Sequence, residues 1–191
     1  MIGNDIVDLK QAAIDSPDSF IEGKRYQRFL YKVFTESEQE LILFAKDKYQ
    51  MVWLLWSIKE AAYKVNVQQF GKRFFNPKRI QCELISLEKG YVKIDNETYF
   101  TTSKITKDYV YSLATLTNLT SIKSKCFKIK NPSYLVQSET LKKRLLKSLN
   151  INCAMVKKNG IGVPKLFINE KQLNYSLSLT HHGNYNGYAI L

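Results

Sequence analysis

A carboxylate and an ammonium group lie four residues apart, at Glu60 and Lys64, in an apolar stretch (residues 51–67) that contains neither Pro nor Gly. On a helix this spacing brings both side chains to one face. One interpretation is a surface ion pair worth about 0.2–0.5 kcal/mol. The other is a site in which Glu60 holds a cation and Lys64 meets an anion, because buried charges need a partner, a metal or a ligand. The spacing leaves both interpretations open.

Possible ligands also occur at the two ends of the chain. Asp5 and Asp8 interrupt a short apolar segment, and each could bond local backbone N–H groups or hold a metal. The only two histidines, His181 and His182, lie between two predicted strands. Adjacent residues of an extended chain point to opposite sides, so one histidine can face a site while the other faces solvent. A plain polar turn is the alternative.

Four helices are predicted to position these groups. The central helix ends near Gly71, and its buried stripe recurs at three- and four-residue spacing: Met51, Leu54, Ile58, Ala61 and Val65. A second helix begins at Ser16 as N-cap and runs to about residue 31. A third begins with a capping box formed by Thr35 and Glu38, covers residues 36–48, and uses Leu41, Ile42 and Phe44 as its apolar face. A basic amphipathic helix covers residues 138–149.

Short apolar runs separated by turn residues predict an antiparallel sheet after the central helix. A strand is also expected at residues 1–9, where Gly3 allows a close approach of the backbone. The remaining predicted strands are residues 80–87, 91–94, 99–102, 109–116, 126–129, 165–168, 175–179 and 185–191. We therefore expect an α+β protein.

The composition fits a folded domain, or two small halves that share a core. The chain has 191 residues, of which 45% are hydrophobic, and its net charge is +12. This charge favours acidic partners. Three widely spaced cysteines suit reduced thiols, and no apolar run predicts a signal peptide or a membrane span. We expect a cytoplasmic protein with no membrane partner.

Three motifs resemble those of the 4'-phosphopantetheinyl transferase superfamily. Residues 3–7 resemble the family's first metal-binding motif. Residues 34–38, followed by residues 56–64, resemble its central signature. Residues 162–164 and 178–183 resemble its substrate-half motif.

The resemblance implies an enzyme that transfers 4'-phosphopantetheine from coenzyme A to a carrier-protein serine and releases 3',5'-ADP. It implies that Asp5 and Glu60 hold Mg²⁺, and that Glu60 and Lys64 are catalytic, with Lys64 at the transferring phosphate. Lys59 would contact phosphate or pack beside the site, and His181 would touch the coenzyme A phosphates. The implied partners are coenzyme A and an acidic acyl or peptidyl carrier protein, with no nucleic acid.

The chain departs from the family pattern at two positions. Val7 stands where surfactin-type members carry a second acid, and Asp8 follows it, as in the small holo-acyl-carrier-protein synthases. Val163 replaces a lysine of the substrate-half motif. Candidate substitutes are Lys157, Lys158 and Lys165.

The order of the motifs predicts two similar α/β halves packed as a pseudo-dimer, in swapped order. Residues 1–117 would form the metal-binding, catalytic half and residues 118–191 the coenzyme A-binding half, in a monomer with one site. The alternative is a small synthase unit with a long insertion, which permits a trimer. Competing functions are a basic non-enzymatic module that binds nucleic acid or an acidic protein, and a family member that has lost activity.

Overall fold

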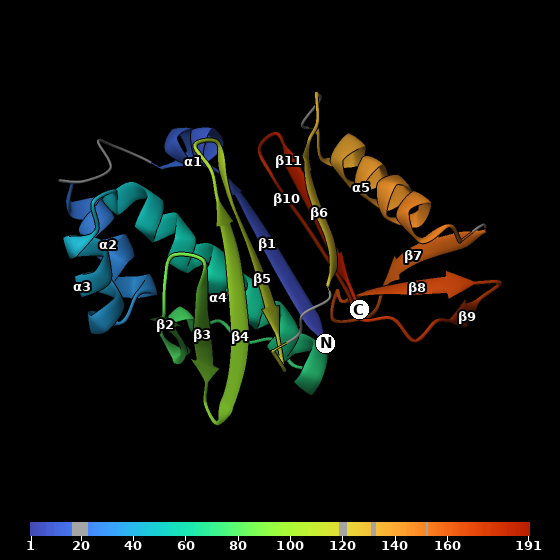
Figure 1. Cartoon of the computed structure of the whole chain (residues 1–191), viewed down its shortest axis with the longest axis horizontal. Coiled ribbons are helices and arrows are strands. Elements are labelled where there is room, and N and C mark those ends of the chain that lie inside the picture. The colour runs from blue at the N-terminus through green and yellow to red at the C-terminus, as the bar shows by residue number, and fades with distance from the viewer. Residues whose placement is uncertain (17–22, 119–121, 131–132, 152) are drawn as a thin grey trace.

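The computed structural model describes residues 1–16, 23–118, 122–130, 133–151 and 153–191. Figure 1 shows an α+β arrangement, as predicted. The helices are α1 (Leu9–Asp15), α2 (Lys24–Val33), α3 (Glu36–Phe44), α4 (Lys48–Phe70) and α5 (Tyr134–Leu149), with a 3-10 turn, η1, at Pro77–Arg79. None of the helices in these ranges combines the length and apolarity needed to cross a bilayer.

The first sheet contains five strands in the order β1-β5-β4-β3-β2. Its strands are β1 (Ile2–Asp8), β2 (Ile80–Leu84), β3 (Lys89–Ile94), β4 (Glu97–Ile105) and β5 (Tyr109–Thr115). All neighbouring pairs are antiparallel, so the predicted antiparallel sheet is confirmed. Figure 1 shows α4 lying across one face of this sheet. β1 forms one edge, and its register places Asp5 opposite Ser112.

α4 is the long helix predicted from apolar spacing. Asp47 caps its first turn by accepting a hydrogen bond from the Gln50 N–H, and Gly71 ends it in a left-handed conformation with φ 67°. Of the predicted stripe, Leu54, Ile58, Ala61 and Val65 are buried and Met51 is partly exposed. The apolar face therefore fixes the orientation of the helix, and the charged residues are placed as a consequence.

Gly3 sets how closely β1 approaches this helix. A Cβ at position 3 would overlap the carbonyl oxygen of Ala61, which belongs to the α4 backbone. The predicted close approach is confirmed, and it brings the aspartate two residues later to the surface of α4.

The segment before α2 differs from the prediction. Asp8 begins α1 as its N-cap, accepting hydrogen bonds from the N–H groups of Lys10 and Gln11. Ser16 is the C-cap of this helix, and its backbone N–H donates to the Ala12 carbonyl oxygen. The expected helix start at residues 17–22 lies outside the described residues.

The capping box at the start of α3 is confirmed, since Thr35 and Glu38 exchange the two reciprocal hydrogen bonds. The predicted apolar face of α3 is largely wrong. Ile42 is buried, but Phe44 is 83% exposed and Leu41 is 38% exposed. α3 is short, and only the face carrying Glu38 and Ile42 is buried, where α3 contacts α4.

The C-terminal part contains two three-stranded sheets, β10-β11-β6 and β7-β8-β9. Their strands are β6 (Lys123–Lys128), β7 (Ala154–Lys158), β8 (Pro164–Ile168), β9 (Lys171–Gln172), β10 (Leu177–His182) and β11 (Tyr185–Ile190). Both histidines belong to β10 and not to the turn after it, because β10 pairs with β11 through His182. The similarity of the two halves and the boundary near residue 117 stay predictions.

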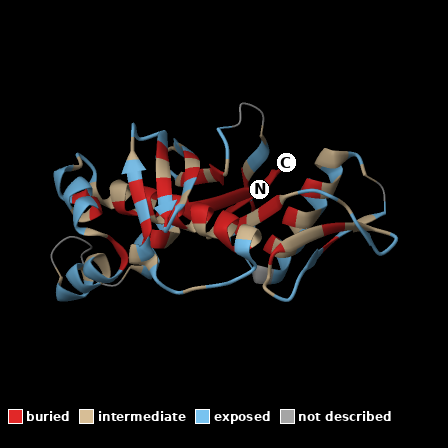
Figure 2. Cartoon of the chain, turned by 90° about the horizontal axis from the view of Figure 1, so that it is seen from below, coloured by how far each residue is buried: buried red, intermediate tan, exposed pale blue. Residues whose placement is uncertain are grey.

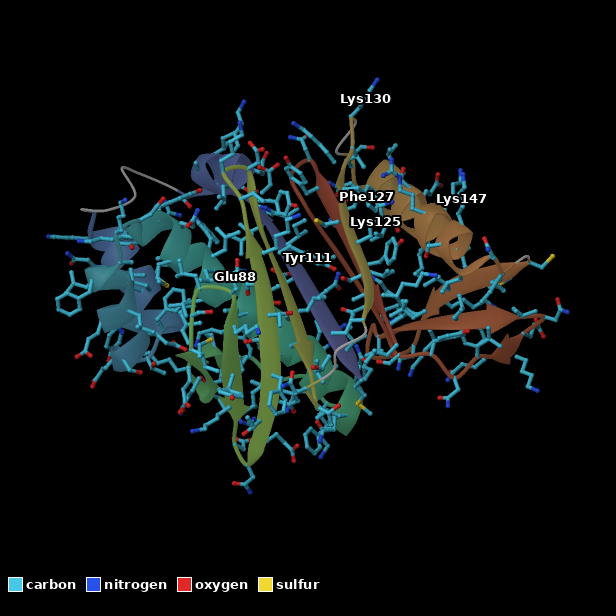
Figure 3. The ribbon with its side chains drawn as sticks, viewed as in Figure 1. Glu88, Tyr111, Lys125, Phe127, Lys130 and Lys147 are labelled. Atoms are coloured by element: carbon cyan, nitrogen blue, oxygen red, sulfur yellow. The ribbon has the colours of Figure 1, made fainter. Side chains whose placement is uncertain are left out.

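The core consists of one apolar cluster around α4 and the first sheet, and a second between α5 and the C-terminal sheets. Figure 2 shows the buried residues along the middle of the molecule. A smaller cluster joins the two parts, and it contains Ile6, Tyr111 and Tyr185. Tyr111, labelled on β5 in Figure 3, donates a hydrogen bond to the Tyr188 carbonyl oxygen at 3.0 Å. The two parts are thus packed together through buried contacts.

Candidate active site

A cavity of about 400 Å³ lies where α4 and β1 meet the C-terminal part. Its polar lining comes from both parts of the chain: Asp5, Glu60, Tyr63, Lys64, Gln68, Arg73, Ser138, Lys142, Lys158, Ser178, Thr180 and His181. The apolar lining includes Val67, Leu141, Val163 and Leu179. Residues more than 170 positions apart in the sequence therefore share one cavity.

Asp5 is held at the cavity wall by two donors. The Lys64 ammonium lies 3.0 Å from Asp5 Oδ1, and the Thr180 hydroxyl donates to the same oxygen at 3.1 Å. Among the described residues, both of these contacts are made by Oδ1. The Asp5 side chain lines the cavity and is 12% exposed.

Glu60 faces the same cavity from α4. Burial raises the pKa of Glu60, the negative charge of Asp5 raises it further, and Lys64 opposes both effects. A cation bound beside these two carboxylates would favour the ionised form of Glu60.

Mg²⁺ fits this donor set. It is usually held by one or two carboxylates together with phosphate oxygens and water, not by a cage of protein ligands. Across the described residues, no three His, Cys, Asp or Glu side chains are grouped to hold a metal. Two carboxylates open to the cavity agree with Mg²⁺ and an anionic substrate that completes its coordination.

Lys64 connects the helix to the strand. Its ammonium group donates to the Asn4 carbonyl oxygen at 2.7 Å as well as to Asp5. The side chain is 27% exposed and lines the cavity. One ammonium therefore fixes the edge of β1 and also presents positive charge to a ligand.

The two histidines point to opposite sides of β10, as the alternation predicts. His181 lines the cavity, and burial together with the charges of Lys64 and Lys158 lowers its pKa. His182 Nδ1 accepts the Asp8 N–H at 2.9 Å. Of the two histidines, His181 is the one that lines the cavity.

Lys59 is not brought into the cavity. Its ammonium group lies 2.8 Å from Glu38 Oε2 and donates to the carbonyl oxygens of Pro77 and Ile80. Its side chain is 3% exposed. Lys59 lies one residue before Glu60, about 100° around the helix, and so faces α3 and β2. This geometry gives no support to a contact between Lys59 and phosphate.

Asp8 is also used structurally. Besides capping α1, it accepts the Asn184 N–H at 2.9 Å, and it is buried. Of the two interpretations left open for this residue, bonding to backbone N–H groups is the one observed. Asp8 does not line the cavity.

Some cavity residues were not predicted from the sequence, and one was among several candidates. Arg73 lies two residues after Gly71, the C-cap of α4, and its Nε donates to the Ile161 carbonyl oxygen at 2.7 Å. Lys142 comes from α5. Of the candidate substitutes for the lysine missing at Val163, only Lys158 lines the cavity. Lys157 instead lies over the Phe167 ring, 5.5 Å from its centroid.

Positive charge dominates the cavity. Besides His181, its acidic and basic lining residues are two carboxylic acids, Asp5 and Glu60, and four cations, Lys64, Arg73, Lys142 and Lys158. Such a lining favours a ligand with several negative charges.

The family model for the 4'-phosphopantetheinyl transferase superfamily matches residues 1–114. No curated protein matches the chain significantly. Among solved structures, the chain is similar to a holo-[acyl-carrier-protein] synthase (AcpS) from Thermotoga maritima, with 14% identity and a TM-score of 0.44 over 90% of this chain and 83% of that one. The matched residues make up more than half of the chain and carry both Asp5 and Glu60, which confirms the resemblance: the chain belongs to the 4'-phosphopantetheinyl transferase superfamily.

Proposed function

We propose that the protein transfers 4'-phosphopantetheine from coenzyme A to a serine of an acyl or peptidyl carrier protein, with Mg²⁺ as cofactor. The observation that carries this proposal is the convergence of Asp5, Glu60 and Lys64 on one cavity that is otherwise lined by cations and His181. Coenzyme A, with a pyrophosphate and a further phosphate, has the negative charge that this lining favours.

In the proposed reaction the serine oxygen bonds to the β-phosphorus of coenzyme A. The bond between this phosphorus and the bridging pyrophosphate oxygen breaks, and 3',5'-ADP leaves. Asp5 and Glu60 would hold Mg²⁺, which when bound neutralises charge on the pyrophosphate. Lys64 would add a fixed positive charge to the same group. Glu60 would also accept the serine proton.

The cavity walls support a monomer as the active unit. They come from both parts of a single chain, so one chain completes the site. We further propose that these parts are the two similar halves of a pseudo-dimer in swapped order. The net charge of +12 favours an acidic carrier protein, whose approach it would steer.

The test is the transfer of a fluorescent phosphopantetheine group from labelled coenzyme A to purified apo carrier proteins. Labelling is expected with Mg²⁺ and not with excess chelator, and intact mass spectrometry would locate the group on serine. Glu60→Gln is expected to lower the rate about 100-fold or more.

Glu88→Gln is the matched control, because Glu88 is an exposed glutamate between β2 and β3 (Figure 3) and does not line the cavity. Its rate should equal that of the parent protein. Equal labelling rates for Glu60→Gln and Glu88→Gln would show that the cavity is not the active site. Failure to label acyl and peptidyl carriers alike would contradict the proposed reaction.

A further inference from the structure

Within the described part of the chain, the outer edge of β1 is bonded by side chains and not by another strand's backbone. Every second N–H of β1 donates to a side chain of the segment that contains β10, and the offset is always 174 residues. The pairs are Ile2 with Ser176 Oγ, Asn4 with Ser178 Oγ, Ile6 with Thr180 Oγ1, and Asp8 with His182 Nδ1. We call these four contacts the side-chain ladder. Because both residue numbers rise together, the two segments run parallel.

Thr180 is the member of the ladder that reaches the cavity carboxylate. Its hydroxyl oxygen accepts the Ile6 N–H at 3.2 Å and lies 3.1 Å from Asp5 Oδ1. A backbone N–H can only donate, and an ionised carboxylate can only accept. The direction of both bonds is therefore fixed: the Thr180 proton points at Asp5.

Ser176 has the same geometry with a neutral acceptor. Its oxygen accepts the Ile2 N–H at 2.9 Å, and its proton goes to Gln68 Oε1 at 2.8 Å. Ser176 does not line the cavity. The ladder thus contains two equivalent hydroxyl relays, and one of them ends on a carboxylate of the site.

We propose that Thr180 is a positioning residue that orients the Asp5 carboxylate for Mg²⁺, a role that rests on the proposed function. The Thr180 hydroxyl and the Lys64 ammonium both bind Oδ1, from opposite parts of the molecule. Two donors on one oxygen restrict rotation of the carboxylate of Asp5, a residue that lines the cavity. Partners of this kind orient metal ligands and commonly change metal affinity by about 10–100-fold.

The test measures Mn²⁺ binding by the electron paramagnetic resonance signal of the free ion, with coenzyme A present and no carrier protein. Thr180→Val keeps the side-chain shape and removes the hydroxyl, and its Mn²⁺ dissociation constant is expected to rise about 10–100-fold. Thr180→Ser keeps the hydroxyl and should bind within about twofold of the parent protein, a change much smaller than that range.

Ser176→Ala is the matched control. It breaks the equivalent relay, so its melting temperature should fall, whereas its Mn²⁺ affinity should stay at the parent value. If Thr180→Val does not fold, Thr180→Cys replaces it, because a thiol is a weak donor of similar size. It should then bind Mn²⁺ more weakly than Thr180→Ser.

The outcomes separate the two proposals. If the parent protein binds no Mn²⁺, the metal site of the proposed function fails, and the role of Thr180 fails with it. If the parent binds Mn²⁺ and the Thr180 variants without a hydroxyl bind it equally well, only the assignment of Thr180 is wrong.

Discussion

Replacing Lys59 by methionine should destabilise the fold strongly. Methionine keeps an unbranched chain but removes the ammonium group that lies 2.8 Å from Glu38 Oε2. Glu38 has no exposed side-chain surface. It would keep the N–H donors of Thr35 and Cys82 but lose its only counter-charge among the described residues. The variant therefore contains a buried carboxylate without an opposite charge.

The size of the effect follows from this burial. Removing one partner of a buried ion pair destabilises a protein by about 3–5 kcal/mol. With an m value of about 2 kcal/mol/M in urea, a loss of about 4 kcal/mol lowers the unfolding midpoint by about 2 M. The double variant Glu38→Gln, Lys59→Met should recover part of this loss, because no charge remains buried.

Urea unfolding followed by tryptophan fluorescence gives the midpoints, and Lys93→Met is the control. Lys93 pairs with Glu83 at 2.6 Å, but both side chains are about half exposed. An exposed pair of this kind contributes about 0–1 kcal/mol. The structural role of Lys59 would be refuted if the midpoint of Lys59→Met were no lower than that of Lys93→Met. If the KM of Lys59→Met for coenzyme A were also raised, the contact between Lys59 and phosphate that the family resemblance implies would be supported.

Three further predictions follow from the cavity and its supports. Without divalent metal, the raised pKa of Glu60 lowers the stability of the folded state as the pH rises from the unfolded pKa of 4.5 through the folded pKa. Near neutral pH, Glu60→Gln should therefore have a higher urea midpoint than the parent protein. Below about pH 4 the two midpoints should be equal. Gly3→Ala should lower the free energy of unfolding by about 1–3 kcal/mol, because the new methyl group would displace β1 from the Ala61 carbonyl oxygen. Calorimetry measures this change, and an unchanged melting temperature would contradict the close approach of β1 to α4. Arg73→Gln and Lys158→Gln should each raise the KM for coenzyme A about 10-fold at similar kcat, as expected for the loss of a charged hydrogen bond. Steady-state kinetics that show a lower kcat and an unchanged KM would contradict a role of these residues in binding coenzyme A.

The sequence predicted those elements whose signals are local. α4 has an unbroken apolar period with a glycine at its end, and the start of α3 has a capping box, so both were located closely. α1 was missed because it is only seven residues long and its cap, Asp8, also reads as the end of a strand. Phe44 was misplaced because the periodicity of a short helix does not show which of its faces meets a partner.

The candidate site was predictable only in part. Asp5, Glu60, Lys64 and His181 were identified through motifs, and all four line the cavity. Arg73 was missed, since its position depends on a contact with Ile161 in the other part of the chain, which no local pattern encodes. The position of Thr180 could have been predicted from the alternation of side chains in a strand. In a strand, residues 178, 180 and 182 lie on one side, which already suggests a row of polar groups directed at a common neighbour.

Because of the side-chain ladder, point mutations can change the strength of the interface between the two parts of the molecule. An ordinary strand edge is joined through carbonyl oxygens, which every sequence possesses, so its specificity is low and exposed edges invite unwanted association. Here the acceptors are hydroxyl groups and one imidazole, which only particular residues supply. Substituting these residues one at a time would loosen the molecule in graded steps, without touching the backbone of either sheet.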